Sequence, residues 1–461
     1  MRVELRALEG HPVIRSFALA WSVCVSLAPA FGGAADRSVE QPPVALHAGM
    51  LLAVPGDEPR PRQVILIDGG IIRAVRTEPA DFSDIMPDAD NLRHIDLSGY
   101  FVMPGLIDAH VHLAHAPGAE YLAHGVTESG AAMALIAAQH ARITLAAGFT
   151  TVVDLGTLGA PGHDRAIYAL RDAIRNGRAV GPRIVAAGNP IAATGQSRTA
   201  GFRPEIGAVM DRNSLCDGPA DCSRAVRDQV HRGADVISFF NTGSLLAADP
   251  VPQAMTYAEM RAIVETAHQL GRRVIADGHH AEGIATAVRA GADVIDSVHP
   301  YDAATFASLG PDTFVQSHIH AVLAAIGDSP DSLNEGLWGW MPQSLLERFY
   351  RIKSRPFAVM EAYRAGVRTI VYASDAGVYS WGDNARDLLE FVERGMPAGD
   401  ALRTATVNAA AMLDMDDELG SIMVGKRADL IALDGNPLED IEAMLRVRFV
   451  MRDGTVFKHA E

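Results

Sequence analysis

Apolar and polar residues alternate in short blocks along most of this chain, and the blocks predict strands and helices in turn. Eight apolar runs typical of buried strands lie between residues 102 and 374. The runs span 102–109, 150–155, 183–188, 234–240, 272–277, 292–298, 313–319 and 368–374. Amphipathic stretches separate most of them, and glycine often follows such a stretch, as at Gly233 and Gly291. Strands that alternate with helices in this way predict an α/β fold of the (β/α)8 barrel type.

The two ends of the chain show a different pattern, in which apolar residues alternate with turn signals. Before the first run, apolar stretches are separated by turns such as the one at Asp68, Gly69 and Gly70. A similar strand-rich stretch closes the chain after residue 416. We therefore expect strands rather than helices on both sides of the repeated strand and helix units.

The first 35 residues resemble an export signal. Arg15 precedes the apolar run 16–31, and small residues follow at 32–35, which is the usual order of a cleaved signal peptide. The apolar run is short for a membrane span. The sequence predicts a mature protein that is periplasmic or secreted and has no membrane contact after cleavage. An uncleaved anchor is the alternative.

Composition limits the partners. The chain has 461 residues and a formal net charge of −16, so no basic stripe is present to neutralise the phosphates of a nucleic acid. The same charge opposes binding to an anionic membrane surface. A small-molecule substrate is the expected partner, and the composition leaves a homo-oligomer open.

Two cysteines remain after the predicted cleavage, Cys216 and Cys222, in the sequence CDGPADC. An exported chain with two cysteines in one glycine- and proline-containing turn favours a disulfide bond between them. Two unpaired thiols are the alternative.

Two histidines stand at the end of the first apolar run. Successive side chains of a strand point to opposite faces, so His110 and His112 leave the strand on the same side. Neutral imidazole is a favoured ligand of divalent transition metals, and two on one face can hold a single ion. The polar face of an edge strand would give the same spacing, but the apolar residues before these histidines favour a buried strand.

Further polar residues follow the other runs. Asp375 ends the eighth run, which lies beside the first when a barrel closes. Its carboxylate can then bind the same metal and take a proton from water that the metal activates. The active site of such a barrel lies at the carboxyl ends of its strands, where further polar residues gather: Asp154, Asn241, Asp277, His279, His299, His318 and His320. For the histidines, a pocket wall or a surface position is the alternative.

One connection is unusually long. Residues 321–360, which include Trp338 and Trp340, separate the seventh run from the eighth. A lid or substrate wall and a plain surface insertion both fit this length.

Nine motifs cover nearly the whole chain after the signal: PGLIDAHVHL, AGFTTVVDLG, GNPIAATG, RGADVISFFNTG, HAEGIATAVRAGADVID, YASDAG, DNARDLLEFVERGM, ALRTATVNAAAML and LGSIMVGKRADLIALDGNPLEDI. On these motifs the chain resembles the amidohydrolase superfamily, in particular its imidazolonepropionase-like and Xaa-Pro dipeptidase-like group. The resemblance implies a barrel beside a small β-sandwich built from both chain ends. The implied organisation is a signal peptide at 1–35, sandwich strands at 36–103, the metal-dependent hydrolase barrel at 104–415 and further sandwich strands at 416–461.

The chain departs from this family at the metal ligands. Ser238 stands where relatives carry a bridging lysine, while Asp277 and Ser297 stand where they carry ligand histidines. Ser197 likewise replaces a histidine of a loop. We therefore expect one divalent ion, zinc with manganese as the alternative, held by the three retained positions and by Asp277. The retained positions are His110, His112 and Asp375.

The resemblance also implies an activity. It predicts metal-dependent hydrolysis of an amide or cyclic-amide C–N bond in a dipeptide, an N-acyl amino acid or a lactam, with Asp375 moving the proton. His279 matches a family histidine near the metal and His299 follows the sixth run, so both are candidates for contacting substrate. The altered ligands leave two alternatives open, a catalytically silent binding or structural protein and a barrel with lyase or decarboxylase chemistry.

Overall fold

The computed structural model describes residues 42–459, with the exception of 87–91, 158–162, 197–202, 211–213, 246–250 and 298–302. The described residues belong to one compact unit that begins at Pro42. The expected signal peptide, Ser197 and His299 lie outside the described residues.

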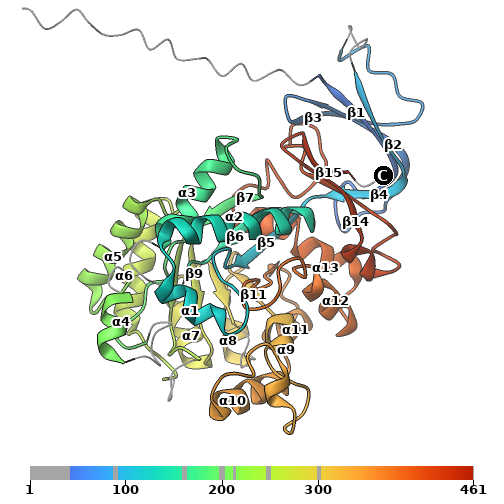
Figure 1. Ribbon diagram of the computed structural model, residues 1–461. Helices are drawn as coiled ribbons and strands as arrows, with labels where there is room; N and C mark the ends of the chain where they lie inside the picture. The colour runs from blue at the N-terminus through green and yellow to red at the C-terminus, as the bar shows by residue number, and fades with distance from the viewer. Residues whose placement is uncertain are drawn as a thin grey trace, which may run out of the picture. The chain divides into compact units, whose positions relative to one another are not determined.

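Eight parallel strands form the centre of this unit, in two sheets (Figure 1). The strands are β5 (Leu106–Val111), β6 (Phe149–Asp154), β7 (Arg183–Ala186), β8 (Ile237–Phe240), β9 (Val274–Asp277), β10 (Val294–Asp296), β11 (Phe314–Ser317) and β12 (Ile370–Tyr372). One sheet has the order β5-β6-β7 and the other the order β12-β11-β10-β9-β8. Parallel bridges join the two sheets, from Val111 to Ala376 beside β12 and from Ile191 to Phe239 in β8. The predicted α/β fold is confirmed.

Helices connect these strands. They are α1 (Glu120–Thr127), α2 (Gly130–Ala146), α3 (Asp164–Arg175), α4 (Pro204–Met210), α5 (Pro219–Arg232), α6 (Tyr257–Gln269), α7 (Ala281–Ala290), α8 (Ala303–Ser308), α9 (His320–Ala325), α10 (Gln343–Lys353), α11 (Ala358–Arg364), α12 (Arg386–Glu393), α13 (Ala398–Thr404) and α14 (Val407–Met412), with short 3-10 turns η2 (Leu333–Glu335) and η3 (Ile441–Leu445). Sequence signals explain several ends. Thr256 and Glu259 form a reciprocal capping box that starts α6. Gly233 and Gly291 adopt left-handed conformations that end α5 and α7.

A seven-stranded sheet contains strands from both ends of the described chain. Its order is β15-β14-β13-β4-β1-β2-β3. The strands are β1 (Val44–Leu51), β2 (Arg60–Asp68), β3 (Ile71–Thr77), β4 (Arg93–Pro104), β13 (Leu430–Leu433), β14 (Val447–Arg452) and β15 (Thr455–His459). The central contact is between β4 and β13, which pair antiparallel. This sheet has its own buried apolar cluster, which includes Leu46, Val102 and Phe449.

The first predicted strand, 102–109, is wrong in its bounds. Its first residues finish β4 in the seven-stranded sheet, and its last residues belong to β5 in the parallel sheet. The change of sheet falls at Gly105, where an added Cβ would lie 2.4 Å from the Thr150 hydroxyl oxygen. The apolar run hid this boundary because both strands are buried on each side of it.

The parallel strands pack through apolar residues, and the polar residues of the site come after these in each strand. One cluster joins the strands to α14: Ile107, Ala109, Val153, Ile275, Val294, Phe314, Val371, Ala409, Ala410 and Met412. Polar residues begin one or two positions further on, at His110, Asp154, Asp277 and Asp296. The carboxyl ends of the parallel strands therefore hold a polar site above an apolar core. Within the described ranges, no helix combines the length and the apolar character that crossing a membrane requires.

Candidate metal centre

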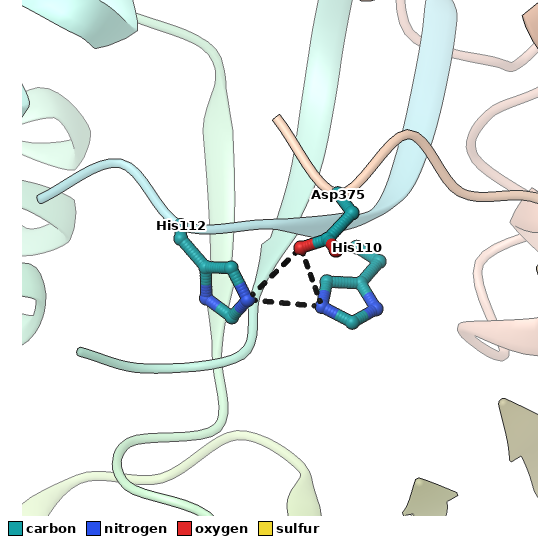
Figure 2. A group of neighbouring side chains, drawn as sticks. All are labelled: His110, His112 and Asp375. Atoms are coloured by element: carbon teal, nitrogen blue, oxygen red, sulfur yellow. Dashed lines mark hydrogen bonds and ion pairs between the residues drawn. The ribbon is translucent and has the colours of Figure 1, made fainter. Parts of the chain in front are cut away.

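Three side chains converge at the junction between the first and last parallel strands. His110 lies in β5, His112 follows it directly, and Asp375 follows β12 (Figure 2). The two Nε2 atoms are 3.0 Å apart, and Asp375 Oδ1 lies 3.4 Å from His110 Nε2 and 3.2 Å from His112 Nε2. A tetrahedral ion with bonds of about 2.0–2.1 Å holds its ligand atoms about 3.3–3.4 Å apart. The three atoms thus fit one small divalent ion.

The backbone places Asp375 with some strain. Its φ angle is 57°, in the left-handed region that few residues other than glycine, asparagine and aspartate adopt. Its N–H donates to the carbonyl oxygen of His110 at 2.9 Å, and the N–H of His112 donates to the carbonyl of Ala376 at 2.8 Å. These bonds lock the end of β5 to the loop after β12. Strain of this kind persists where surrounding structure enforces it, as is common at functional sites.

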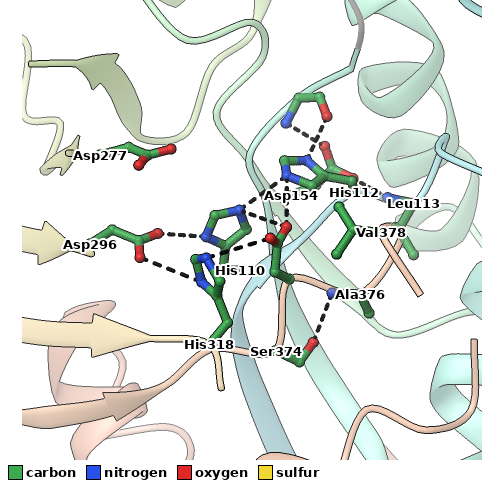
Figure 3. Close-up of polar contacts among 12 residues, drawn as sticks. His110, His112, Leu113, Asp154, Asp277, Asp296, His318, Ser374, Ala376 and Val378 are labelled. Carbon is green, nitrogen blue, oxygen red and sulfur yellow. Dashed lines mark hydrogen bonds and ion pairs between the residues drawn. The ribbon is translucent and has the colours of Figure 1, made fainter. Parts of the chain in front are cut away.

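The far nitrogen of each histidine also has a partner (Figure 3). His110 Nδ1 lies 2.5 Å from Asp296 Oδ2, and His112 Nδ1 lies 2.8 Å from the carbonyl oxygen of Gly156. A proton on each Nδ1 leaves the Nε2 lone pair free for a metal. Gly156 is required where it is, because an added Cβ would lie 2.2 Å from the carbonyl oxygen of Gly188.

A second group of donors adjoins the first. His318 follows β11, and its Nε2 lies 3.5 Å from Asp375 Oδ2. Its Nδ1 faces Asp296 Oδ1 at 3.7 Å, so Asp296 stands between the imidazoles of His110 and His318. All of these side chains except Asp375 are at most 7 % exposed.

The carboxylates and imidazoles in this cluster shift one another's pKa values toward the charged forms. Burial would raise the pKa of Asp375, but the imidazoles of His318 and His110 together lower it well below its usual range. Burial would lower the pKa of His110, but the charges of Asp296 and Asp375 outweigh it and raise that pKa to about 9. Burial would likewise raise the pKa of Asp296, yet His110 and His318 lower it. Both carboxylates are therefore ionised, which favours a bound cation.

The cluster forms one wall of a pocket with about 800 Å³ of empty space, part of it open to solvent. The polar lining residues are His110, His112, Ser244, Asp277, His279, His318 and Asp375. The remaining lining is apolar: Phe240, Leu245, Ala321, Val322, Ala325, Trp338, Phe349 and Val378. Five of these apolar residues come from the long connection before β12. That connection is therefore a pocket wall, and the indole N–H of Trp338 fixes it by donating to the Val378 carbonyl at 3.0 Å.

Comparison with known proteins identifies the family. Residues 101–457 match the model of the amidohydrolase family, which is most of the chain. The chain belongs to the amidohydrolase family.

Several relatives of this amidohydrolase are known. It is 28% identical over 446 residues to an ochratoxinase of Aspergillus niger, which covers 90% of this chain and 86% of the relative. A crystal structure of a Xaa-Pro dipeptidase with bound methionine is 31% identical, covers 90% of this chain and all of the other, and superposes with a TM-score of 0.78. A putative prolidase from Bifidobacterium longum is 25% identical, with a TM-score of 0.73 over 91% of this chain and 96% of the other. The predicted superfamily and group are confirmed, and the chain is a member of a family of hydrolases.

The structure brings together some of the expected site residues of this amidohydrolase and not others. His110, His112 and Asp375 form one donor group, as described above. Asp277 and His279 line the same pocket, 3.6 Å apart between Oδ1 and Nε2, but within the described ranges Asp277 belongs to neither donor group.

Ser238 and Ser297 belong to neither donor group within the described ranges. Ser238 is buried in β8, and its Oγ has no hydrogen-bond partner among the described residues. Ser297 is buried as well, and it follows β10 without lining the pocket.

Two site residues of this amidohydrolase escaped the sequence analysis. Asp296 was not among the expected site residues, and His318, which was expected at a pocket wall or the surface, lines the pocket and also lies against Asp375. The available signal was a charged residue at the end of an otherwise apolar strand, and a histidine at the end of the next one. Elsewhere in the fold, Cys216 and Cys222 form a disulfide bond that joins the start of α5 to the residues before it.

Proposed function

We propose that this amidohydrolase uses one divalent metal ion, zinc with manganese as the alternative, to hydrolyse an amide or cyclic-amide C–N bond of a small molecule. The observation that carries the proposal is the triangle of His110, His112 and Asp375 at the base of a pocket. Its donor atoms have the spacing that one ion needs. The two imidazoles are oriented by hydrogen-bond partners at their Nδ1 atoms. When bound, the ion would polarise a substrate carbonyl and activate a water molecule.

The chain's own residues carry the remaining chemistry. Asp375 offers Oδ1 to the donor triangle, while Oδ2 lies toward His318 and remains available as a base. In that position Asp375 takes a proton from the attacking water and returns it to the leaving nitrogen. His279 lines the same pocket as this carboxylate and is suited to contact the substrate.

The pocket's apolar side suggests what the substrate looks like. Phe240, Trp338 and Phe349 supply aromatic surface opposite the polar residues, and these side chains bind flat apolar groups well. Ochratoxinase and Xaa-Pro dipeptidase are relatives of this chain, and both names fit hydrolysis of a bond in a small molecule. We propose a dipeptide, N-acyl amino acid or lactam with a bulky apolar or aromatic group.

We also propose an architecture and a location for the whole chain. The bridges at Val111 and Ile191 support a single (β/α)8 barrel formed from the two parallel sheets. The seven-stranded sheet supports the expected sandwich built from both chain ends. The sequence of residues 1–35 supports export to the periplasm or the exterior.

A catalytically silent binding protein is the second candidate. Ser238, Asp277 and Ser297 favour it, because they remove three of the ligands expected in relatives. The same test decides between the two candidates.

The test combines metal content with turnover. The mature protein is purified without added metal, and its metal content is measured by mass spectrometry alongside His110→Ala. Turnover is then measured on a panel of dipeptides, N-acyl amino acids and lactams with small or aromatic side groups, for wild type and Asp375→Asn. One ion per wild-type chain, none in His110→Ala, and turnover lost in Asp375→Asn would support the enzyme. Equal, negligible turnover in both proteins would favour the silent protein.

A further inference from the structure

A buried cluster behind the metal triangle is not explained by the proposed function. Asp296 ends β10, its side chain is fully buried, and it faces His110 and His318 (Figure 3). Gln316 Nε2 donates to Asp296 Oδ2 at 2.9 Å, the same oxygen that lies 2.5 Å from His110 Nδ1. The other oxygen, Oδ1, has no hydrogen-bond partner among the described residues, and the nearest base is His318 Nδ1 at 3.7 Å.

Two functions fit such a cluster, and one distance separates them. His110, Asp296 and His318 are close enough to hold a second ion. However, two ligand atoms on one ion stand at least about 2.9 Å apart, given bonds of about 2.1 Å at right angles. The 2.5 Å between His110 Nδ1 and Asp296 Oδ2 is shorter than that, so these atoms form a short charge-assisted hydrogen bond and do not share an ion. A proton therefore lies between these atoms, and a metal does not.

We propose that Asp296 is the positioning residue of this site, a carboxylate that orients the His110 imidazole toward Asp375 and also faces His318. The inference rests on the proposed metal-dependent function. Through His110 Nδ1, Asp296 turns the His110 Nε2 lone pair toward Asp375 Oδ1, where the ion would bind. The other oxygen of Asp296 faces His318 Nδ1 at 3.7 Å, and His318 Nε2 lies 3.5 Å from Asp375 Oδ2.

The strand register gives Asp296 this place. β10 lies between β9 and β11, and Asp296 pairs with Asp277 on one side and Gln316 on the other. The neighbouring Ser297 does not line the pocket. The sixth strand thus contributes an orienting carboxylate one residue before the position where relatives supply a ligand. This arrangement explains how a site that lacks three ligands keeps its remaining ones rigid.

The test uses Asp296→Asn and Asp296→Leu in the mature chain, with Asp164→Asn as the matched control. Asp164 is also a buried carboxylate, but it lies in α3, paired with Arg232. Zinc affinity is measured by competition with a chromophoric chelator. Loss of a carboxylate partner of a metal-ligating histidine weakens binding about 10–100-fold. We expect weaker binding in Asp296→Asn, weaker still in Asp296→Leu, and wild-type binding in Asp164→Asn.

A second measurement needs no metal. In the metal-free protein, the proton between His110 and Asp296 should give a low-field NMR resonance that Asp296→Leu removes and Asp164→Asn retains. If wild type binds zinc and both Asp296 variants bind it equally well, the inference fails and the proposed function stands. If wild type binds no zinc but the resonance behaves as expected, the proposed function fails and the orienting role stands. A spectrum without this resonance in wild type would overturn the orienting role.

Discussion

Removing the metal should make the stability of this protein depend on pH through His110. In the metal-free protein, the charges of Asp296 and Asp375 raise the pKa of His110 from 6.5 to about 9, despite burial that opposes protonation. A group whose pKa is raised on folding stabilises the folded state fully below its unfolded pKa. That stabilisation disappears as the pH rises through the folded value. The window therefore runs from about pH 6.5 to about pH 9.

The expected size follows from the shift. A difference of about 2.5 pKa units corresponds to about 3 kcal/mol in the free energy of unfolding, at about 1.4 kcal/mol for each unit. His110 is only 3 % exposed, so solvent screens this effect little. Bound metal removes the trend, because the ion needs a deprotonated Nε2 and the gain in its affinity offsets the loss of metal-free stability. Metal affinity should therefore rise about tenfold for each pH unit below about 9.

The assay is urea denaturation of the chelator-treated protein at several pH values from 6.5 to 9, for wild type and His110→Gln. We expect the wild-type midpoint to fall across this window and the His110→Gln midpoint to change much less. Saturating zinc should make the wild-type midpoint nearly independent of pH across this window, because His110 is then deprotonated in both the folded and the unfolded state. Parallel curves for wild type and His110→Gln would refute the assignment of this titration to His110.

The other predictions test separate parts of the molecule. Asp375→Asn should lower kcat about 10²–10⁴-fold, the usual value of a general base, while a circular dichroism spectrum stays unchanged. Trp338→Ala should raise KM about tenfold for an aromatic substrate, because losing about 50 Å² of apolar contact costs about 1.3 kcal/mol of binding free energy. The half-exposed Trp340 does not line the pocket, so Trp340→Ala should not raise KM. Cys216→Ser opens a short loop and should cost less than about 3 kcal/mol, so a larger loss in urea denaturation would contradict a merely local role for the bond. Amino-terminal sequencing of the exported protein should give a first residue near Ala35. An intact Met1 would exclude cleavage.

The sequence predicted the donor triangle because its signals are local. His110 and His112 are two apart at the end of a strand, which fixes their common side without knowledge of the rest of the fold. Asp375 was found from the same strand-end position, and the order of strands in a barrel placed it beside the first one. These inferences need only alternation and chain order.

Asp296 and His318 were harder to predict because their orientation depends on register. β10 has only three residues, so a shift of one residue exchanges Asp296 and Ser297 between the pocket and the surrounding packing. The bounds of the first strand failed for a related reason. An apolar run that passes from one buried sheet into another shows no change in hydrophobicity at Gly105.

The pocket wall was predicted only as one of two alternatives. The length of the connection before β12 was plain from the sequence, but its position depends on tertiary contacts such as the Trp338 bond to Val378. Such contacts join residues that are distant in the chain, and no periodic pattern predicts them. The positions of side chains that act through long-range contacts therefore cannot be predicted from the sequence pattern.

The bonds between the end of β5 and the loop after β12 have a consequence for how the protein matures. Ser374 and Asp108, which flank this junction, are bonded across a separation of 266 residues. A nascent chain contains both histidines long before Asp375 emerges, so it cannot assemble the triangle. The site becomes complete only when the last parallel strand closes against the first. Metal capture would then act as a checkpoint that only a fully synthesised and folded molecule passes, and the ion would fasten the first strand to the last.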